Sequence, residues 1–230
     1  MKTAILIDGA FYRKQANKLF GQKSAEDRAK ELFTYCMKFL EKENEHRELY
    51  RIFYYDCPPI KKKIYHPLLK KDINFEQSAL YSWMNEFLNE LTKKRKFALR
   101  LGRLSEQANY TLKTQTIKDL IDKKISIDNL TEEHFMIDVK QKGVDMRIGL
   151  DISSMAFKKQ VEQIILIAGD SDFVPAAKQA RREGIDFIID PMANHINSDL
   201  NEHVDGIETH YKDILKVAEE NGRRKEQSKN

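Results

Sequence analysis

Short runs of apolar residues without polar alternation recur along the chain and predict strands that are buried on both faces. Such runs occupy residues 3–7, 164–168 and 185–189. A strand of a parallel sheet covered by helices has this pattern, because neither of its faces meets water. Aromatic and β-branched residues predict further strands. These cover residues 49–55, 97–104 and 136–139, with an edge strand beginning at Ile207.

Helical periodicity appears between these runs. Ser24-Ala25-Glu26-Asp27 resembles a capping box and opens an amphipathic helix. Other helices are predicted from about Phe75 to Lys96, over residues 144–159, up to residue 183, and after Asn197 or Ser198. Residues 61–71 are predicted to form a loop, and residues 105–124 a flexible excursion. Strands that alternate with helices indicate an α/β sandwich of three layers, with a mainly parallel central sheet flanked by helices.

Composition narrows the class of protein. The chain has 230 residues, of which 41% are hydrophobic and 33% charged. Its longest aliphatic run in the second half, Ile164–Ala168, is far shorter than the ~20 residues that cross a bilayer, so no membrane protein is expected. The two cysteines and the absence of a signal-peptide pattern favour a reducing cytoplasm without a disulfide framework. The sequence contains no CxxC and no HxxxH pair, so a zinc site is not expected.

The net charge of +4 is unevenly distributed. Residues 57–124 contain 15 Lys and Arg against 7 Asp and Glu, whereas the rest of the chain is mildly acidic. A basic segment indicates an anionic partner, most often a nucleic acid. A solvated lysine-rich surface is the alternative explanation.

Aspartates stand where the predicted strands end. Asp8 and Asp170 follow two apolar runs, Asp145 begins a helix, and Asp172 lies close behind Asp170. Each alone also suits a turn or a helix N-cap. Because the carboxyl ends of parallel strands share one edge, we expect the four to meet, and crowded carboxylates repel unless a cation binds. Mg²⁺ prefers oxygen ligands, and such a site can activate water and stabilise charge on a phosphodiester.

Three motifs carry a resemblance to a known family. They are Ile5–Ala10, Lys142–Met146 and Ala168–Pro175. In this order they resemble the NYN domain of the LabA/DUF88 type, a branch of the PIN-like metal-dependent ribonucleases. The resemblance covers about residues 1–211. Ala10 stands where the family commonly has Asn, which removes one polar group near the first aspartate.

This resemblance implies a PIN-like fold and a function. We expect a single domain over residues 1–211 with a basic insertion at about 57–124, followed by a helix end and polar tail over 212–230. The implied activity is that of an endoribonuclease hydrolysing RNA phosphodiester bonds with Mg²⁺ or Mn²⁺. RNA, single-stranded or structured, is the implied partner, and assembly into a homo-oligomer is left open.

The implied site has a core and a second tier. The catalytic and metal-binding core consists of Asp8, Asp145, Asp170 and Asp172. The second tier consists of Asp151, Asp56 and Ser171. Asp151 lies six residues after Asp145 and therefore ~120° away around the helix, so we expect it on the helix surface or behind the ligands.

Cations are expected near this site, because an anionic strand must be held beside an acidic pocket. The candidates are Lys61, Lys62, Lys63, Lys93, Lys94, Arg95, Lys96, Arg100, Arg103 and Lys142. His195, in the loop after residue 190, is more simply a solvent-exposed histidine than a substrate contact.

Two other functions are alternatives. One is a non-catalytic RNA-binding or regulatory protein that keeps the acidic pocket without turnover. The other is a HAD-like phosphatase, which also uses aspartates at strand ends. That class needs a second Asp two residues after its nucleophile, where this chain has Ala10.

Overall fold

The computed structural model describes residues 1–41 and 45–216, which form two compact units. Unit 1 comprises residues 1–56, 86–102 and the part of the chain from Gly143 onward. Unit 2 comprises residues 57–85 and 103–142. The single domain with an insertion at about 57–124 stays a prediction. Of the predicted tail, residues 217–230 lie outside the described residues.

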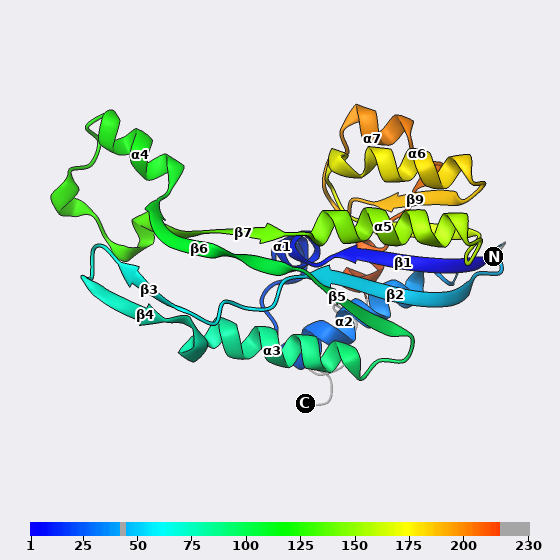
Figure 1. Ribbon diagram of the computed structural model, residues 1–230, viewed down its shortest axis with the longest axis horizontal. Helices are drawn as coiled ribbons and strands as arrows, with labels where there is room; N and C mark the ends of the chain where they lie inside the picture. Colours follow the sequence, from blue (N-terminus) through cyan, green and yellow to red (C-terminus); the bar gives the residue numbers. More distant parts are fainter. Residues whose placement is uncertain (42–44, 217–230) are drawn as a thin grey trace, which may run out of the picture. The chain divides into compact units, whose positions relative to one another are not determined.

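A parallel sheet of six strands forms the centre of unit 1 (Figure 1). Its order is β10-β9-β8-β1-β2-β5, and every neighbouring pair runs parallel. The strands are β1 (Lys2–Asp8), β2 (Glu48–Asp56), β5 (Phe97–Leu101), β8 (Gln163–Ile167), β9 (Asp186–Asp190) and β10 (Gly206–Ile207).

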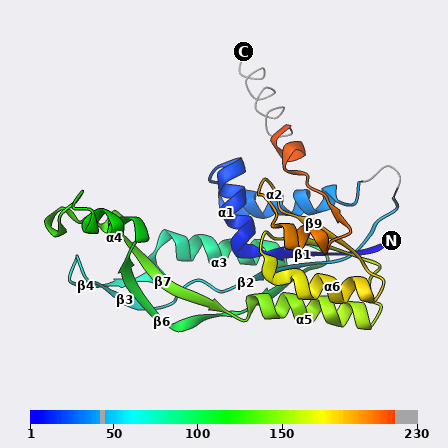
Figure 2. The ribbon, with the colours of Figure 1, turned by 90° about the horizontal axis from the view of Figure 1, so that it is seen from above.

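Helices cover both faces of this sheet. They are α1 (Gly9–Phe20), α2 (Ala25–Lys38), α5 (Val144–Phe157), α6 (Val174–Arg182) and the short α7 (Ser198–Glu202). Seen from above, α1 and α2 lie on one side of the strands and α5 and α6 on the other (Figure 2). The predicted α/β fold with a parallel central sheet flanked by helices is therefore confirmed.

The burial of the central strands accounts for their uninterrupted runs of apolar residues. Residues Ala4–Ile7 of β1 and Ile164–Ile167 of β8 are completely buried, because helices cover both faces. The sheet order reverses between these two strands: from β1 the chain proceeds outward through β2 and β5, and it returns to β8 for the other half. In open α/β sheets such a reversal leaves a crevice beyond the carboxyl ends of the strands, where ligands bind.

The helix α1 was not predicted from the sequence pattern. It begins directly after Asp8 and buries Tyr12, Gln15 and Ala16. A polar glutamine on the buried face weakens the apolar stripe that identifies a helix. Its start is nevertheless well defined, since Asp8 caps it.

Unit 2 consists of two antiparallel hairpins with a helical excursion (Figure 1). One pairs β3 (Lys63–His66) with β4 (Lys71–Asn74), and the other pairs β6 (Arg103–Leu112) with β7 (Phe135–Lys142). The buried His66 ring packs at a tilt against Tyr110, with 4.1 Å between ring centroids, and against Phe135 at 5.1 Å. The helix α4 (Thr114–Ile121) and the 3-10 turns Ile127–Asn129 and Glu132–His134 connect β6 to β7.

These elements correct several predictions. Residues 61–71 were predicted as a loop but form most of the first hairpin, and the predicted excursion over 105–124 contains β6 and α4. The strand predicted over 97–104 is interrupted at Gly102, and its two halves belong to different sheets. The helix predicted from Phe75 is a 3-10 turn, Phe75–Gln77, followed by α3 (Ala79–Thr92). None of the helices in the described residues is both long and apolar enough to traverse a membrane.

Candidate functional site

Two of the predicted aspartates cap helical turns at the carboxyl edge of the sheet. Asp8 ends β1, and its Oδ1 accepts the backbone N–H of Phe11 at 3.1 Å. Asp170 follows β8, and its Oδ1 accepts the backbone N–H of Asp172 at 3.1 Å. The ordinary role of aspartate as a helix cap is thus real at both positions. It occupies one carboxylate oxygen of each residue.

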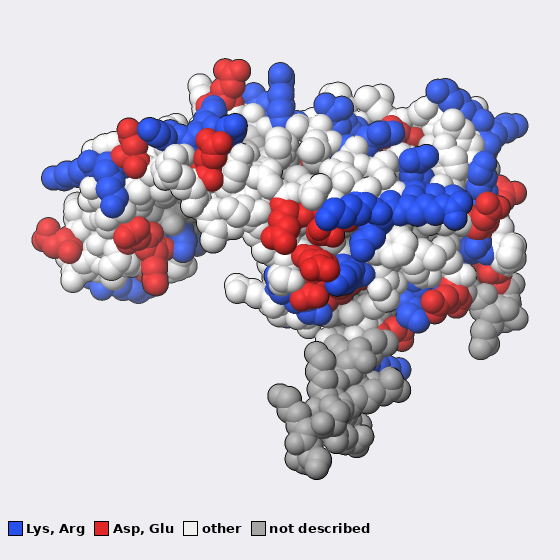
Figure 3. Space-filling view, turned by 90° about the horizontal axis from the view of Figure 1, so that it is seen from below, with Lys and Arg blue, Asp and Glu red and all other residues white. Residues whose placement is uncertain are grey.

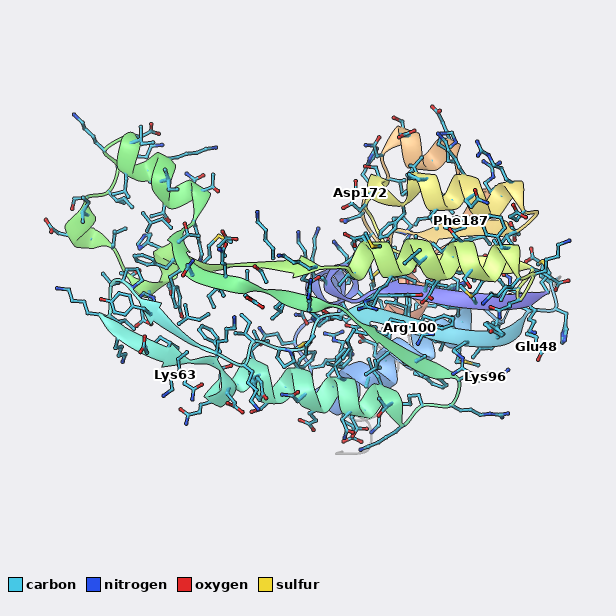
Figure 4. The ribbon with its side chains drawn as sticks, in the orientation of Figure 1. Glu48, Lys63, Lys96, Arg100, Asp172 and Phe187 are labelled. Carbon is cyan, nitrogen blue, oxygen red and sulfur yellow. The ribbon has the colours of Figure 1, made fainter. Side chains whose placement is uncertain are left out.

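The four predicted core aspartates interact electrostatically. Burial raises the pKa of Asp8, and the nearby charge of Asp145 raises it further, against the opposing effect of the Phe11 hydrogen bond. Burial also raises the pKa of Asp145, as do the charges of Asp170 and Asp172. Asp172 lies in the segment between β8 and α6 (Figure 4). The edge therefore gathers four carboxylates close enough for their charges to repel.

The donor chemistry of this edge suits Mg²⁺ or Mn²⁺, which prefer oxygen ligands. Within the described residues, however, no three His, Cys, Asp or Glu side chains form a group that can hold a metal ion. Mg²⁺ is commonly held by one or two carboxylates while it keeps several waters. The aspartates thus fit such a cation by chemistry, without forming a preassembled ligand cage.

A cleft of ≈880 Å³ opens at this edge, where the sheet order reverses. Segments that follow β1, β8 and β9 line it, as expected for the carboxyl ends of neighbouring strands. Its lining comprises Asp8, Ala10, Phe11, Lys14, Gly169, Asp170, Ser171, Asn194, His195, Asn197 and Ser198. Asp8 and Asp170 therefore share one concave surface with the second-tier Ser171.

Several residues of the cleft were missed by sequence reasoning. Lys14 is its cation, and it lies on α1, the helix that the pattern did not predict. Asn194 and Asn197 come from the loop after β9. The rule that pointed to Asp8 and Asp170 applies to this loop too, since β9 is parallel to its neighbour β8. His195 is exposed and belongs to the same lining.

Asp56, a second-tier prediction, is part of a buried network at the start of α1. It ends β2, forms an ion pair with Arg13 and accepts the hydroxyl of Tyr54 at 3.0 Å. Arg13 also donates to the Tyr54 hydroxyl at 3.2 Å. A Cβ atom on Gly9 would lie 2.5–2.6 Å from atoms of Tyr54 and Asp56. The network therefore requires glycine directly after Asp8.

Asp151, the other second-tier aspartate, joins α5 to the sheet. Its Oδ2 accepts the hydroxyl of Tyr55 at 2.9 Å and Nε of Arg100 at 3.0 Å. The Arg100 guanidinium also lies over the ring of Phe53, 5.1 Å from its centroid. Arg100, predicted as a phosphate contact, is thus engaged within unit 1 (Figure 4).

The basic residues between α3 and β5 lie at the opposite edge of the sheet from the aspartates. Lys96 precedes β5, which is parallel to β2, and its Nζ donates to the backbone oxygen of Leu49. Figure 4 shows Lys96 beside Glu48, at the amino ends of these strands. Lys93 forms an ion pair with Glu90. We therefore do not include Lys93, Lys94, Arg95 and Lys96 among the cations near the aspartates.

The remaining predicted cations belong to unit 2. Lys61 pairs with Glu76 at 3.2 Å, and Lys62 Nζ donates to the backbone oxygen of Glu106 at 2.6 Å. Lys63 lies at the start of β3, and Arg103 faces Lys142 across the β6–β7 pair. Unit 2 contains twelve Lys and Arg against nine Asp and Glu. The excess over residues 57–124 is therefore divided between two units, and Figure 3 shows basic and acidic side chains interspersed on the face it presents.

Comparisons with known proteins place the chain in a family. The model of the NYN domain matches residues 2–207. No curated protein matches the chain. A crystal structure of a protein of unknown function, VPA0982 from Vibrio parahaemolyticus RIMD 2210633, is 13% identical over 90% of each chain, with a TM-score of 0.45. NYN domains belong to the PIN-like superfamily, whose members are generally nucleases that use divalent metals. This protein, which the family model matches over residues 2–207, is a member of the NYN domain family.

Proposed function

We propose that this protein is a metal-dependent endoribonuclease that hydrolyses RNA phosphodiester bonds at the carboxyl edge of its sheet. The observation that carries the proposal is the mutual repulsion of the aspartates there. Burial raises the pKa of both Asp145 and Asp8; the charges of Asp170 and Asp172 raise that of Asp145 further, and the charge of Asp145 raises that of Asp8 further. Carboxylates that lie close together beside a cleft repel each other, and a bound divalent cation would relieve that repulsion.

Within the cleft, Asp8 and Asp170 would hold Mg²⁺ or Mn²⁺, with Asp145 and Asp172 contributing negative charge beside them. When bound, such an ion lowers the pKa of a coordinated water and stabilises charge on a phosphodiester. Lys14 would attract a phosphate of the strand, since its cationic side chain lines the same cleft as Asp8 and Asp170. Ser171 and the polar side chains of the loop after β9 would donate hydrogen bonds to the sugar-phosphate backbone.

The test is cleavage of single-stranded RNA by Asp8→Asn and Asp170→Asn in the presence of Mg²⁺ or Mn²⁺. The amide keeps the volume of the carboxylate and its ability to cap the helix, so the fold should persist while metal affinity falls. We expect cleavage to decrease by orders of magnitude, with unchanged circular dichroism. Asp128→Asn, at an exposed position in unit 2, is the matched control. Full cleavage by both edge variants would exclude the proposed site.

One observation favours the second candidate, a non-catalytic RNA-binding protein. The described residues contain no preassembled group of three metal ligands. The same assay separates the two functions, because a binding protein would retain RNA without cleaving it in either metal. The HAD-like phosphatase has no comparable support, since Ala10 occupies the position of its required second aspartate.

A further inference from the structure

We propose that the base of the β6–β7 hairpin in unit 2 is a phosphate-binding site for an RNA strand, built around Arg103 and Lys142. This inference rests on the proposed function in one respect, that the anionic ligand is RNA. It assigns a ligand to a cavity of unit 2 whose lining shares no residue with that of the cleft in unit 1.

The first observation is a pair of like charges in register. Arg103 and Lys142 are direct partners in the antiparallel pair, so their side chains project from the same face of the hairpin. Like charges directly opposite each other destabilise a pair of strands. Within residues 1–41 and 45–216, neither cation is joined to a carboxylate that relieves this repulsion. Two neighbouring cations that repel each other and have no carboxylate partner within a protein are typical of an anion-binding site.

The second observation is a bulge next to this pair. The register passes from Leu104 opposite Gln141 to Ala108 opposite Val139, so three residues of β6 face one residue of β7. Bulges bend a strand and redirect side chains, and they are common next to binding sites. This bulge borders a cavity of ≈350 Å³ lined by Arg103, Leu104, Ser105, Glu106, Gln107 and Lys142.

The third observation is the charge around the cavity. Lys62 Nζ donates to the backbone oxygen of Glu106 at 2.6 Å, which brings a third cation to the bulge. Glu106 supplies the one carboxylate of the lining. Three cations against one carboxylate leave a net positive charge that suits a phosphodiester. The volume is at the low end of the ~300–1,000 Å³ of small-molecule pockets, which suits one phosphate with its sugar.

The experiment measures RNA binding without cleavage. The full chain carries Asp170→Asn, and a labelled single-stranded RNA is titrated by fluorescence anisotropy in EDTA. Arg103→Gln with Lys142→Gln is compared with the control Lys118→Gln with Lys123→Gln, which removes two charges from the same unit outside the cavity. We expect several-fold weaker binding in the first double variant alone. The slope of log affinity against log salt should shrink by about 1.4, since each lost phosphate contact accounts for about 0.7.

Melting of the two double variants excludes a trivial explanation. Removing the repulsion between Arg103 and Lys142 should leave the melting temperature unchanged or raise it, so weaker binding would not reflect unfolding. If the two double variants respond alike to salt, the pair is only a solvated surface and the proposal fails.

A calorimetric titration with inorganic phosphate distinguishes the source of the anion. Phosphate binding that is lost in the first double variant, with RNA affinity unchanged, would assign the cavity to a free anion and overturn the RNA proposal. RNA binding is measured without metal and therefore does not depend on cleavage. If the wild-type protein cleaved no RNA, the proposed nuclease function would fail, but the binding experiment would still test the phosphate site.

Discussion

The ring of Phe11 occupies the space that a side chain at Gly169 would need. A Cβ atom on Gly169 would lie 2.6 Å from Cε2 of Phe11, well inside van der Waals contact. Phe11 belongs to the first turn of α1 and Gly169 to the segment after β8, so two walls of the cleft meet at this contact. The shape of the cleft therefore depends on glycine at residue 169.

We predict that Gly169→Ala displaces Phe11 and lowers both stability and RNA cleavage. Inserting a methyl group into a packed contact costs about 1–3 kcal/mol of unfolding free energy, which urea denaturation will measure. Combining Gly169→Ala with Phe11→Ala should cost less than the sum of the two single losses, because the clash is absent from the double variant. Gly149→Ala is the control, since a Cβ there meets no atom within 4 Å and alanine favours the helix. Additive effects of the two substitutions would contradict the contact.

A second substitution tests the network of Asp56, Arg13 and Tyr54 at the start of α1. Gly9→Ala places a Cβ 2.5 Å from the Tyr54 ring and 2.6 Å from an oxygen of Asp56, both of which are buried. We expect it to destabilise the fold more than Gly169→Ala, because relieving the clash disturbs the ion pair of Asp56 with Arg13. Thermal melting of the two variants side by side provides the comparison. An equal or smaller loss for Gly9→Ala would show that this network adapts freely.

The pH dependence of stability should report on Asp190. This fully buried carboxyl accepts the Tyr35 hydroxyl at 2.6 Å and the Met192 N–H at 2.7 Å, and burial raises its pKa to about 6. The folded state then binds the proton more tightly than the unfolded chain, whose pKa is about 3.9. The free energy of unfolding should therefore fall as pH rises from about 4 to about 6, by on the order of 3 kcal/mol from this group.

Asp190→Asn should flatten that dependence, because the amide does not ionise and the Tyr35 hydroxyl can accept its N–H. Denaturation at several pH values between 4 and 6 tests this. A hydrogen bond with Glu208 raises the pKa of His210 above its usual 6.5, so that group titrates above this range. Asp199→Asn, at an exposed position, is the control. An unchanged slope in Asp190→Asn would assign the effect to other carboxyls.

Divalent cations should stabilise the folded protein. A cation that binds only the folded state raises stability by mass action, and here it would also relieve the repulsion around Asp145. We expect the melting temperature to rise in millimolar Mg²⁺ or Mn²⁺ and to return to its original value with EDTA. The rise should be smaller in Asp145→Asn. Equal rises in both proteins would place the cation elsewhere.

The sequence predicted the fold where pattern and burial agree. Residues 3–7 and 164–168 read as strands buried on both faces, and their structure follows from that. Prediction failed for elements that lack a regular pattern of buried apolar residues. The helix α1 was not predicted because polar Gln15 interrupts the apolar stripe on its buried face. The strand β6 was not predicted because its hairpin with β7 buries little apolar surface, and alternate residues of β7 are exposed. Gly102 carried no sign that the chain changes from one sheet to another there.

The candidate site likewise contains residues that the sequence predicts and residues that it does not. The rule that parallel strands end at one edge is enough to predict that Asp8, Asp145 and Asp170 meet, and their charges do interact. The same rule is silent on Lys14, because that residue depends on an unpredicted helix. Nor does any pattern in the chain indicate that Arg100 has a partner in Asp151, since tertiary contact alone joins them.

The position of β1 between β2 and β8 has a consequence for synthesis on the ribosome. One edge of β1 pairs with β2, which is complete at Asp56, whereas its other edge pairs with β8, which is complete only at Ile167. The ribosome adds about 110 residues between these points, which takes about 5–20 s at ordinary rates of elongation. During that time β1, whose residues Ala4–Ile7 are completely buried in the folded protein, has an unpaired edge, a template for association with other chains. Slow translation of this stretch would therefore lower the yield of folded protein more than slow translation after Ile167.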